Sequence, residues 1–139
     1  MSKEAKAFFD TNVLVYACDK DTPDKQEKAK NLMRRHAHGN LPCISTQVLQ
    51  EFYVSATRKL GIEPHRAKDI IISFQDMETA LVDVDDIRRA IDGNIIWQIS
   101  FWDALIIATA RKLRCNVIYT EDLNHGQIYD SVQALNPFL

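Results

Sequence analysis

The chain has 139 residues, of which 46% are hydrophobic and 26% charged, and its formal net charge is −2 at pH 7. This balance excludes an intrinsically disordered chain, which has few apolar residues and a large net charge. It also excludes a membrane span, because apolar runs such as Ala104–Ala108 fall far short of the ~20 residues that a spanning helix requires. The length corresponds to one domain, residues 1–139.

The three cysteines, Cys18, Cys43 and Cys115, lie far apart in the sequence. Their number and spacing fit neither a disulfide framework nor a zinc site, and we expect Cys43 and Cys115 to be buried thiols. The first six residues are charged and lack the apolar stretch of a signal peptide. The sequence therefore predicts a cytoplasmic protein.

In the first half of the chain, a short apolar strand is expected at 7–9 and a short helix from Val13 onward. Thr22-Pro23 is a strong helix start, with threonine as the N-cap and proline at the first helical position. Apolar residues at helical spacing follow, and Gly39 is expected to end this helix. A second short strand is expected at 41–44.

In the second half, the pattern of short apolar runs between helical stretches continues. The expected elements are a helix capped by Ser45 or Thr46, a helix opened by Pro64, a strand at 81–84, a helix capped by Asp85, a helix after Ser100 and a strand at 117–119. Such alternation is typical of a parallel sheet covered on both faces. The sequence predicts one α/β domain with four or five short parallel strands flanked by helices.

Four acidic residues occupy related positions in this framework: Asp10, Glu51, Asp103 and Asp122. Asp10 and Asp122 follow strands, and Glu51 lies early in the helix after a strand, so all three belong at the carboxyl edge of the sheet, where α/β proteins bind ligands. Asp103 reaches that edge only if its helix begins on the same side. Converging carboxylates without a neighbouring cation repel one another, and Mg²⁺ or Mn²⁺ would neutralise them.

Each of these acids also has an ordinary structural interpretation. Asp10 fits the N-cap of the following helix, Glu51 fits a solvated helix position, and Asp122 fits a turn. Asp103 lies three residues after Ser100, a spacing that resembles a capping box. Spacing alone leaves a metal site and these structural roles both open.

Four segments around the acids resemble the motifs of the PIN-domain family and, within it, the VapC-type toxins of toxin–antitoxin pairs. They are Phe8–Tyr16, Ile44–Phe52, Phe101–Ala108 and Ile118–Gly126, and the tail Ala134–Phe138 resembles the usual ending of the family. A single motif such as Asp-Thr-Asn is common. Four motifs in the family's order and spacing make a specific resemblance.

The resemblance implies a single PIN-like domain with an α/β/α sheet and a metal-dependent endoribonuclease activity. It implies that Asp10, Glu51, Asp103 and Asp122 are the catalytic acids and coordinate Mg²⁺ or Mn²⁺. It assigns supporting roles to Thr11, Asn12 and Thr120, and Glu121 adjoins the fourth acid as a candidate to share its role. The implied partners are an RNA substrate, a cognate antitoxin protein and a second copy in a homodimer, with no membrane.

Hydrolysis by water would leave 5′-phosphate and 3′-hydroxyl ends on the RNA. Candidate cations for its phosphates are Arg58, Lys59, Arg111, Lys112 and Arg114, although a solvated helix face is their commoner meaning. The main alternative is a non-catalytic PIN-like module for RNA binding or regulation, for which a missing acid would be the signal. A small phosphatase is a further alternative, but Asn12 occupies the position of its usual second aspartate.

Overall fold

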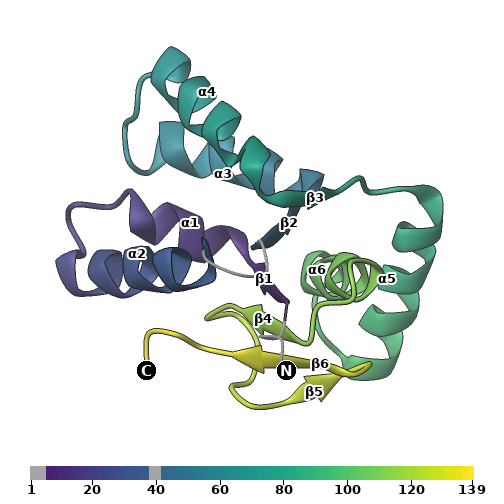
Figure 1. Cartoon of the computed structure of the whole chain (residues 1–139). Coiled ribbons are helices and arrows are strands. Elements are labelled where there is room, and N and C mark those ends of the chain that lie inside the picture. The colour runs from purple at the N-terminus through teal and green to yellow at the C-terminus, as the bar shows by residue number, and fades with distance from the viewer. Residues whose placement is uncertain (1–5, 38–41) are drawn as a thin grey trace.

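A sheet of six strands forms the centre of the computed structural model, which describes residues 6–37 and 42–139 (Figure 1). The strand order is β3-β2-β1-β4-β6-β5, and every neighbouring pair is parallel except β5 and β6. The strands are β1 (Ala7–Phe9), β2 (Cys43–Ser45), β3 (Glu78–Ala80), β4 (Val117–Tyr119), β5 (Ile128–Tyr129) and β6 (Val132–Leu135).

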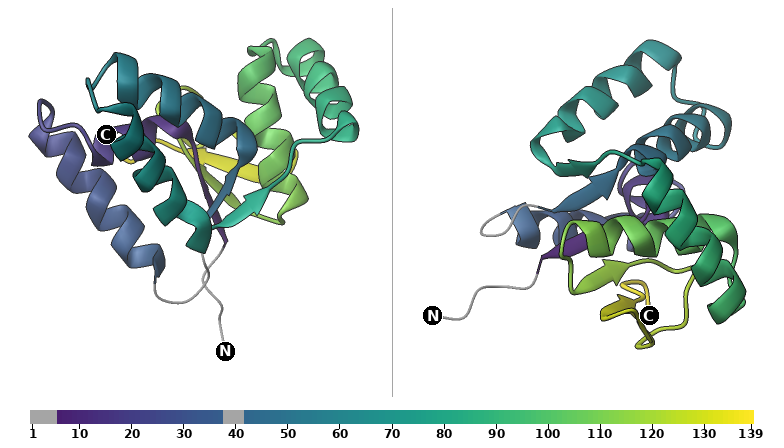
Figure 2. Two further views of the ribbon diagram at one scale, coloured as in Figure 1. Left: turned by 90° about the horizontal axis from the view of Figure 1, so that it is seen from above. Right: turned by 90° about the vertical axis from the view of Figure 1, so that its right-hand side faces the viewer.

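Helices cover both faces of this sheet. Figures 1 and 2 show α1 and α2 on one side of the strands and α6, with α5 packed against it, on the other. The helices of the described residues are α1 (Thr11–Ala17), α2 (Pro23–Ala37), α3 (Thr46–Arg58), α4 (Pro64–Ser73), α5 (Val84–Trp97) and α6 (Phe101–Lys112), with a 3₁₀ turn at Phe74–Asp76. The predicted α/β class with a parallel sheet flanked by helices is confirmed.

The central strands are apolar on both faces because helices pack on both sides. Phe8 pairs with Cys43 of β2 on one side and with Ile118 of β4 on the other, and all three side chains are fully buried. The chain leaves β1 toward β2 but returns from β3 to β4 on the opposite side of β1. The carboxyl ends of β1 and β4 therefore border the point where the strand order reverses, which is where open α/β sheets form their ligand crevice.

The strand predicted at 81–84 is wrong: the third strand, β3, ends at Ala80. The apolar residues that suggested a later strand are largely exposed, Leu81 at 69% and Val84 at 80% of their surface. The predicted cap of the next helix is also wrong, because Asp83 rather than Asp85 is the N-cap. Asp83 and Asp86 form a reciprocal capping box, which starts the helix two residues early.

The sheet also has more strands than the four or five predicted. β5 and β6 form a hairpin whose two loop residues, Asp130 and Ser131, both have positive φ angles. This backbone conformation suits a two-residue hairpin but is uncommon without glycine, so the turn gives a weak sequence signal. Gly39 and Leu41, which were expected to end a helix and begin a strand, lie outside the described residues.

Cys43 and Cys115 are buried, as predicted, and neither forms a disulfide within the described residues. Pro23 and Pro64 are the first residues of α2 and α4, and Ser45 is the N-cap of α3. Across the residues that the structure describes, no helix combines the length and the apolar character needed to cross a membrane.

Candidate metal centre

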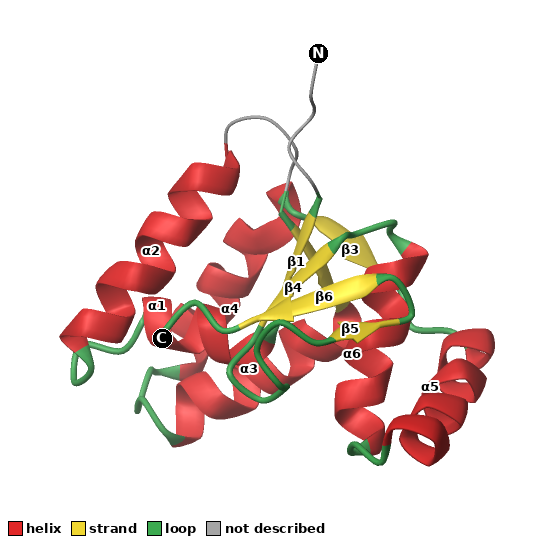
Figure 3. Cartoon of the chain, turned by 90° about the horizontal axis from the view of Figure 1, so that it is seen from below, coloured by secondary structure: helices red, strands yellow, loops and turns green. Residues whose placement is uncertain are grey.

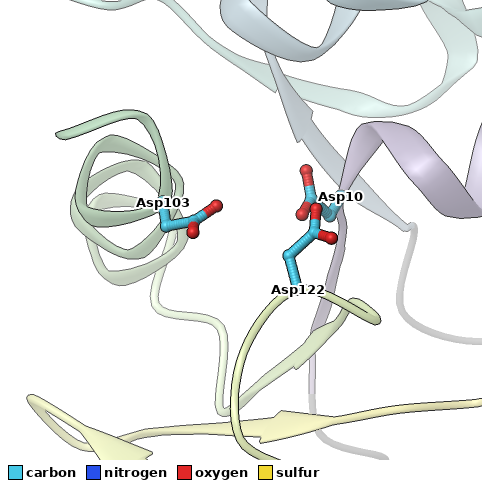
Figure 4. Close-up of side chains that lie close together, drawn as sticks. All are labelled: Asp10, Asp103 and Asp122. Atoms are coloured by element: carbon cyan, nitrogen blue, oxygen red, sulfur yellow. The ribbon is translucent and has the colours of Figure 1, made fainter. Parts of the chain in front are cut away.

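Three aspartates from distant parts of the chain meet at the carboxyl edge of the sheet. Asp10 follows β1, Asp103 lies in the first turn of α6, and Asp122 lies in the loop after β4. One carboxylate oxygen from each lies within 4.8 Å of the others. Figure 4 shows the three carboxylates turned toward a common point from three separate elements. Below, these residues are called the aspartate trio.

The position of Asp10 is set by the end of β1 and the start of α1. Its backbone N–H continues the sheet by donating to the carbonyl of Tyr119, and its Oδ1 accepts from the backbone N–H of Thr11 at 2.7 Å as the N-cap of α1. Its Oδ2 accepts the hydroxyl of Thr120 at 2.7 Å. The expected N-cap role of Asp10 is therefore real, and it coexists with membership of the trio.

Asn12 connects two members of the trio. Its Nδ2 donates to Asp10 Oδ2 at 3.3 Å and to Asp122 Oδ2 at 3.1 Å, and it lies 3.3 Å from the hydroxyl oxygen of Thr120. Thr120 in turn accepts the backbone N–H of Asp122 at 3.1 Å. Thr120 and Asn12 thus hold the carboxylates of Asp10 and Asp122 in fixed orientations.

Asp103 reaches the trio because α6 begins at the same edge of the sheet. Ser100 is the N-cap of α6, and its hydroxyl oxygen accepts the backbone N–H of Asp103 at 3.0 Å. The carboxylate of Asp103 turns toward Asp10 and Asp122 (Figure 4). The sequence placed Asp103 at this edge only if its helix begins on the same side, and α6 does begin there.

Glu51 lies beside the trio rather than within it. The hydroxyl of Thr11 donates to its Oε1 at 3.1 Å, and the negative charges of Asp103 and Asp122 act on its carboxylate. One helical turn earlier on α3, the Nε2 of Gln47 donates to the carbonyl of Trp102 at 3.1 Å. Gln47, which the sequence reasoning missed, therefore links the helix that carries Glu51 to the helix that carries Asp103. The sequence signal for Gln47 was its position four residues before Glu51, which places both side chains on one face of the helix.

The neighbouring acids Glu121 and Asp122 point to different partners. The carboxylate of Glu121 accepts the hydroxyl of Tyr16 at 2.8 Å and pairs with the ammonium of Lys25 at 3.2 Å. Asp122 joins the trio instead. Tyr16 and Lys25 belong to α1 and α2, so Glu121 ties the loop after β4 to those helices.

Burial dominates the electrostatics of Asp10 and Asp103. It raises the pKa of Asp10 from 3.8 to about 7, although the hydrogen bonds from Thr120 and Thr11 lower it, and the charges of Asp122 and Glu51 raise it further. Burial also raises the pKa of Asp103 and of Glu51. Among the ion pairs of residues 6–37 and 42–139, none brings a lysine or arginine to a trio member.

A comparison of the sequence with protein-family models identifies the family of this chain. A model of the PIN domain matches residues 7–130. This chain belongs to the PIN domain family. Among curated proteins, none matches the chain significantly in sequence.

Solved structures of a VapC toxin and of toxin–antitoxin complexes have a similar fold. VapC20 of Mycobacterium tuberculosis, a toxin that cleaves the sarcin–ricin loop, superposes with a TM-score of 0.68 at 20% identity, over 84% of this chain and 90% of its own. A toxin–antitoxin complex from Klebsiella pneumoniae gives 0.70 at 20% identity, over 95% and 98%. VapBC2 of Rickettsia felis, bound to a promoter DNA fragment, gives 0.69 at 17% identity, over 92% and 96%.

The donor set of this PIN domain fits a hard divalent cation. Carboxylate oxygens are the ligands that Mg²⁺ and Mn²⁺ prefer, and three of them converge here from a fixed hydrogen-bond network. In addition, the buried Oδ1 of Asn12 has no hydrogen-bond partner within the described part of the chain. A bound cation would offset the mutual repulsion that accompanies the raised pKa values.

A groove of about 540 Å³ opens beside the trio of this PIN domain. Its walls include Glu51, Asp122 and Lys59, which places one of the expected cations next to the acids. Arg111 and Lys112 are engaged elsewhere, in ion pairs with Asp130 and with the α5 acids Asp83 and Asp86.

Proposed function

We propose that this PIN domain is a Mg²⁺- or Mn²⁺-dependent endoribonuclease that acts as the toxin of a type II toxin–antitoxin pair. The observation that carries the proposal is the convergence of three carboxylate oxygens at the carboxyl edge of the sheet. Membership of the PIN family and the shared fold of VapC20 support it. Asp10, Asp103 and Asp122 would hold the cation, with Glu51 as the fourth acid at the rim.

When bound, the divalent ion supplies neutralisation of phosphate charge and a lowered pKa for a coordinated water. The chain's own contribution is to keep the acids in place. Thr120 and the Thr11 N–H each donate to one oxygen of Asp10, which fixes the plane of that carboxylate. Because the pKa of Asp10 is about 7 without metal, loading the site releases a proton from Asp10 over part of the population near neutral pH.

The proposal is tested by incubating a labelled single-stranded RNA with the protein in Mg²⁺, in Mn²⁺ and in EDTA. We expect cleavage only with a divalent ion, and products with 5′-phosphate and 3′-hydroxyl ends. Asp103→Asn removes one trio charge at constant size and should lower the rate by orders of magnitude. Asp69→Asn makes the same change at an exposed position of α4 and should leave the rate unchanged.

Cleavage in EDTA, or 2′,3′-cyclic phosphate ends, would contradict the proposal. RNA binding without any cleavage in either metal would favour a non-catalytic PIN module.

The toxin role is tested in cells. Controlled expression of the wild-type chain should arrest growth, and expression of Asp103→Asn to the same level should not. Co-expression of the protein encoded beside it should relieve the arrest and co-purify with the chain, as expected for a cognate antitoxin. Unimpaired growth on expression of an active nuclease would leave the metal-dependent RNA cleavage intact but remove the toxin role.

A further inference from the structure

A second concave site lies between α2 and the chain that follows β4 and β6. It encloses about 470 Å³, and Lys28, Arg35 and His125 line it together with Leu32, Leu135 and Asn136. No acidic side chain is among its lining residues. Figure 3 shows the C-terminal segment after β6 extending toward α2, where Lys28 donates to the carbonyl of Phe138. We call this site the α2 pocket.

The cations of the α2 pocket come from one face of α2. Lys28, Asn31, Leu32 and Arg35 are spaced at i, i+3, i+4 and i+7, so they follow one stripe of the helix. Seven residues of helix separate Lys28 from Arg35 by about 10 Å, which sets the length of the basic edge. In the described ion pairs neither of these two cations has an acidic partner.

Two of the basic groups are oriented before any ligand arrives. The guanidinium of Arg35 donates to the hydroxyl of Tyr119 at 3.1 Å, which leaves its other N–H groups for a ligand. His125 accepts the backbone N–H of Asn136 on Nδ1 at 2.9 Å, so the neutral ring carries its proton on Nε2. Leu32, Leu135 and Pro137 supply an apolar surface beside these donors.

A short path connects the α2 pocket to the aspartate trio. Glu121 directly precedes Asp122 in the chain and forms an ion pair with Lys25. Lys25 lies one helical turn before Lys28 on α2. The Lys25 ammonium also lies 5.6 Å from the centroid of the Phe138 ring, and Lys28 donates to the Phe138 carbonyl at 3.5 Å. The C-terminal segment therefore contacts both Lys28 of the α2 pocket and Lys25, the ion-pair partner of Glu121.

We propose that the α2 pocket binds a nucleotide of the RNA strand flanking the cleaved bond, with Lys28 and Arg35 on its phosphates and the apolar surface under its base or ribose. This assignment rests on the proposed nuclease function. Before metal binds, the trio itself is negative, Lys59 is the one expected cation that the structure describes in the groove beside it, and the net charge of −2 attracts no RNA. Lys28 and Arg35, on the helix that the Lys25–Glu121 ion pair ties to the loop of Asp122, supply that attraction without pairing with the trio.

The test measures binding of a fluorescein-labelled single-stranded RNA of twelve nucleotides by anisotropy, at several KCl concentrations in the Asp103→Asn background, which is not expected to cleave it. The pocket variant is Lys28→Gln with Arg35→Gln. Its matched control is Lys30→Gln with Arg34→Gln, exposed cations on other faces of the same helix that give the same change in charge.

We expect the pocket variant to bind at least tenfold more weakly at low salt. Its slope of log affinity against log salt should be shallower by about 1.4, the value for two lost single-strand phosphate contacts. The control pair should keep the parent slope. Equal losses in the two pairs, or none in the pocket variant, would overturn the proposal. So would hexaglutamate binding with the same dependence on Lys28 and Arg35, because the pocket would then serve an acidic protein segment.

Cleavage by proteins with an intact trio separates the two proposals. If the parent cleaves RNA and the pocket variant shows a raised KM with an unchanged kcat, both are supported. If the parent cleaves and the KM of the pocket variant is unchanged, the pocket assignment alone fails. If the parent does not cleave but the salt slopes differ as expected, the nuclease function alone fails.

Discussion

Asp10 combines a structural and an electrostatic role in one buried carboxylate. It caps α1 through the N–H of Thr11 and accepts the hydroxyl of Thr120, and it is 6% exposed. These hydrogen bonds favour the ionised form, but the loss of water around the group opposes it more strongly and its pKa rises to about 7. Without metal, this carboxylate therefore costs stability at neutral pH.

The pH dependence of folding measures that cost. The pKa of Asp10 is about 7 in the folded protein against 3.8 ordinarily, so the folded state holds its proton across that window while the unfolded state has lost it. The stabilisation that the protonated Asp10 gives the folded state is fully present below pH 3.8, and it is lost as the pH rises through about 7. The free energy of unfolding of the wild type relative to Asp10→Asn should therefore fall by about 1.4 kcal/mol per pH unit within the window.

Urea titrations of both proteins in EDTA at a series of pH values check this prediction. A difference that stays flat, or that grows in favour of the wild type as pH rises, would show that Asp10 is not the destabilising acid.

The two adjacent acids after β4 have different partners. Asp122 belongs to the trio, whereas Glu121 is held by Tyr16 and Lys25. We expect Asp122→Asn to lower the cleavage rate by roughly tenfold more than Glu121→Gln, a difference of ~1.4 kcal/mol in the barrier. Rates at several Mg²⁺ concentrations decide it, and a larger loss from Glu121→Gln would reverse the assignment.

At the scale of elements, the contact between α5 and α6 depends on Gly93. A Cβ at this position would lie 2.7 Å from a ring carbon of Trp97 and 3.2 Å from the Cβ of Ala104 on α6. The Trp97 ring also packs edge-on against Tyr129, with centroids 5.5 Å apart, so it cannot move without losing that contact.

Gly93→Ala should therefore destabilise the protein, although glycine to alanine inside a helix ordinarily stabilises by about 1 kcal/mol. Asp69→Ala, at an exposed position of α4, is the control and should change the melting temperature little. Thermal unfolding of the three proteins provides the measurement. A higher melting temperature for Gly93→Ala would mean that the two helices separate easily.

The elements with local signals were the predictable ones. Pro23 and Pro64 mark helix starts because proline fits the first helical turn, and the strands at 7–9 and 117–119 stand out as short apolar runs. β3 was misplaced because the apolar run continues beyond the strand into exposed positions. β5 was missed because a strand of two residues followed by a turn without glycine leaves almost no pattern in the sequence.

The sequence likewise predicted the candidate site only in part. The order of strands and helices places acids at the carboxyl edge, but which oxygens meet is decided by tertiary structure. Glu51 lies outside the trio and accepts the hydroxyl of Thr11, and Glu121 also lies outside it and contacts Tyr16 and Lys25 on α1 and α2. The α2 pocket depends on the C-terminal segment lying beside α2, which no local pattern signals.

At the scale of the whole molecule, α5 presents an apolar stripe to solvent. Val84, Ile87, Ile91 and Ile95 are all exposed on the helix face away from α6, and Arg88 and Asp92 flank them. Contiguous exposed isoleucines typically mark an interaction surface. We expect this face to pair with the same face of a second copy, because an isologous contact would bury the apolar stripe of each copy against that of the other.

Light scattering of size-separated protein tests the expected dimer. Ile91→Asp should convert it to monomer, because a charge would be buried without a partner. Ile72→Asp is the matched control on α4, since Ile72 and Ile91 are both 47% exposed, and it should remain a dimer. A wild-type monomer at micromolar concentration, or a dimer that survives Ile91→Asp, would remove α5 as the contact.

We propose that Asp10, Asp103 and Asp122 together hold a divalent cation. Calorimetric titration of metal-stripped protein with Mn²⁺ measures this binding without a substrate or a partner. We predict that Asp10→Asn, Asp103→Asn and Asp122→Asn each weaken binding by about tenfold or more, a loss typical even of groups that only support a metal, while Asp69→Asn binds like the wild type. Unchanged Mn²⁺ affinity in any two of the three trio variants would contradict the account.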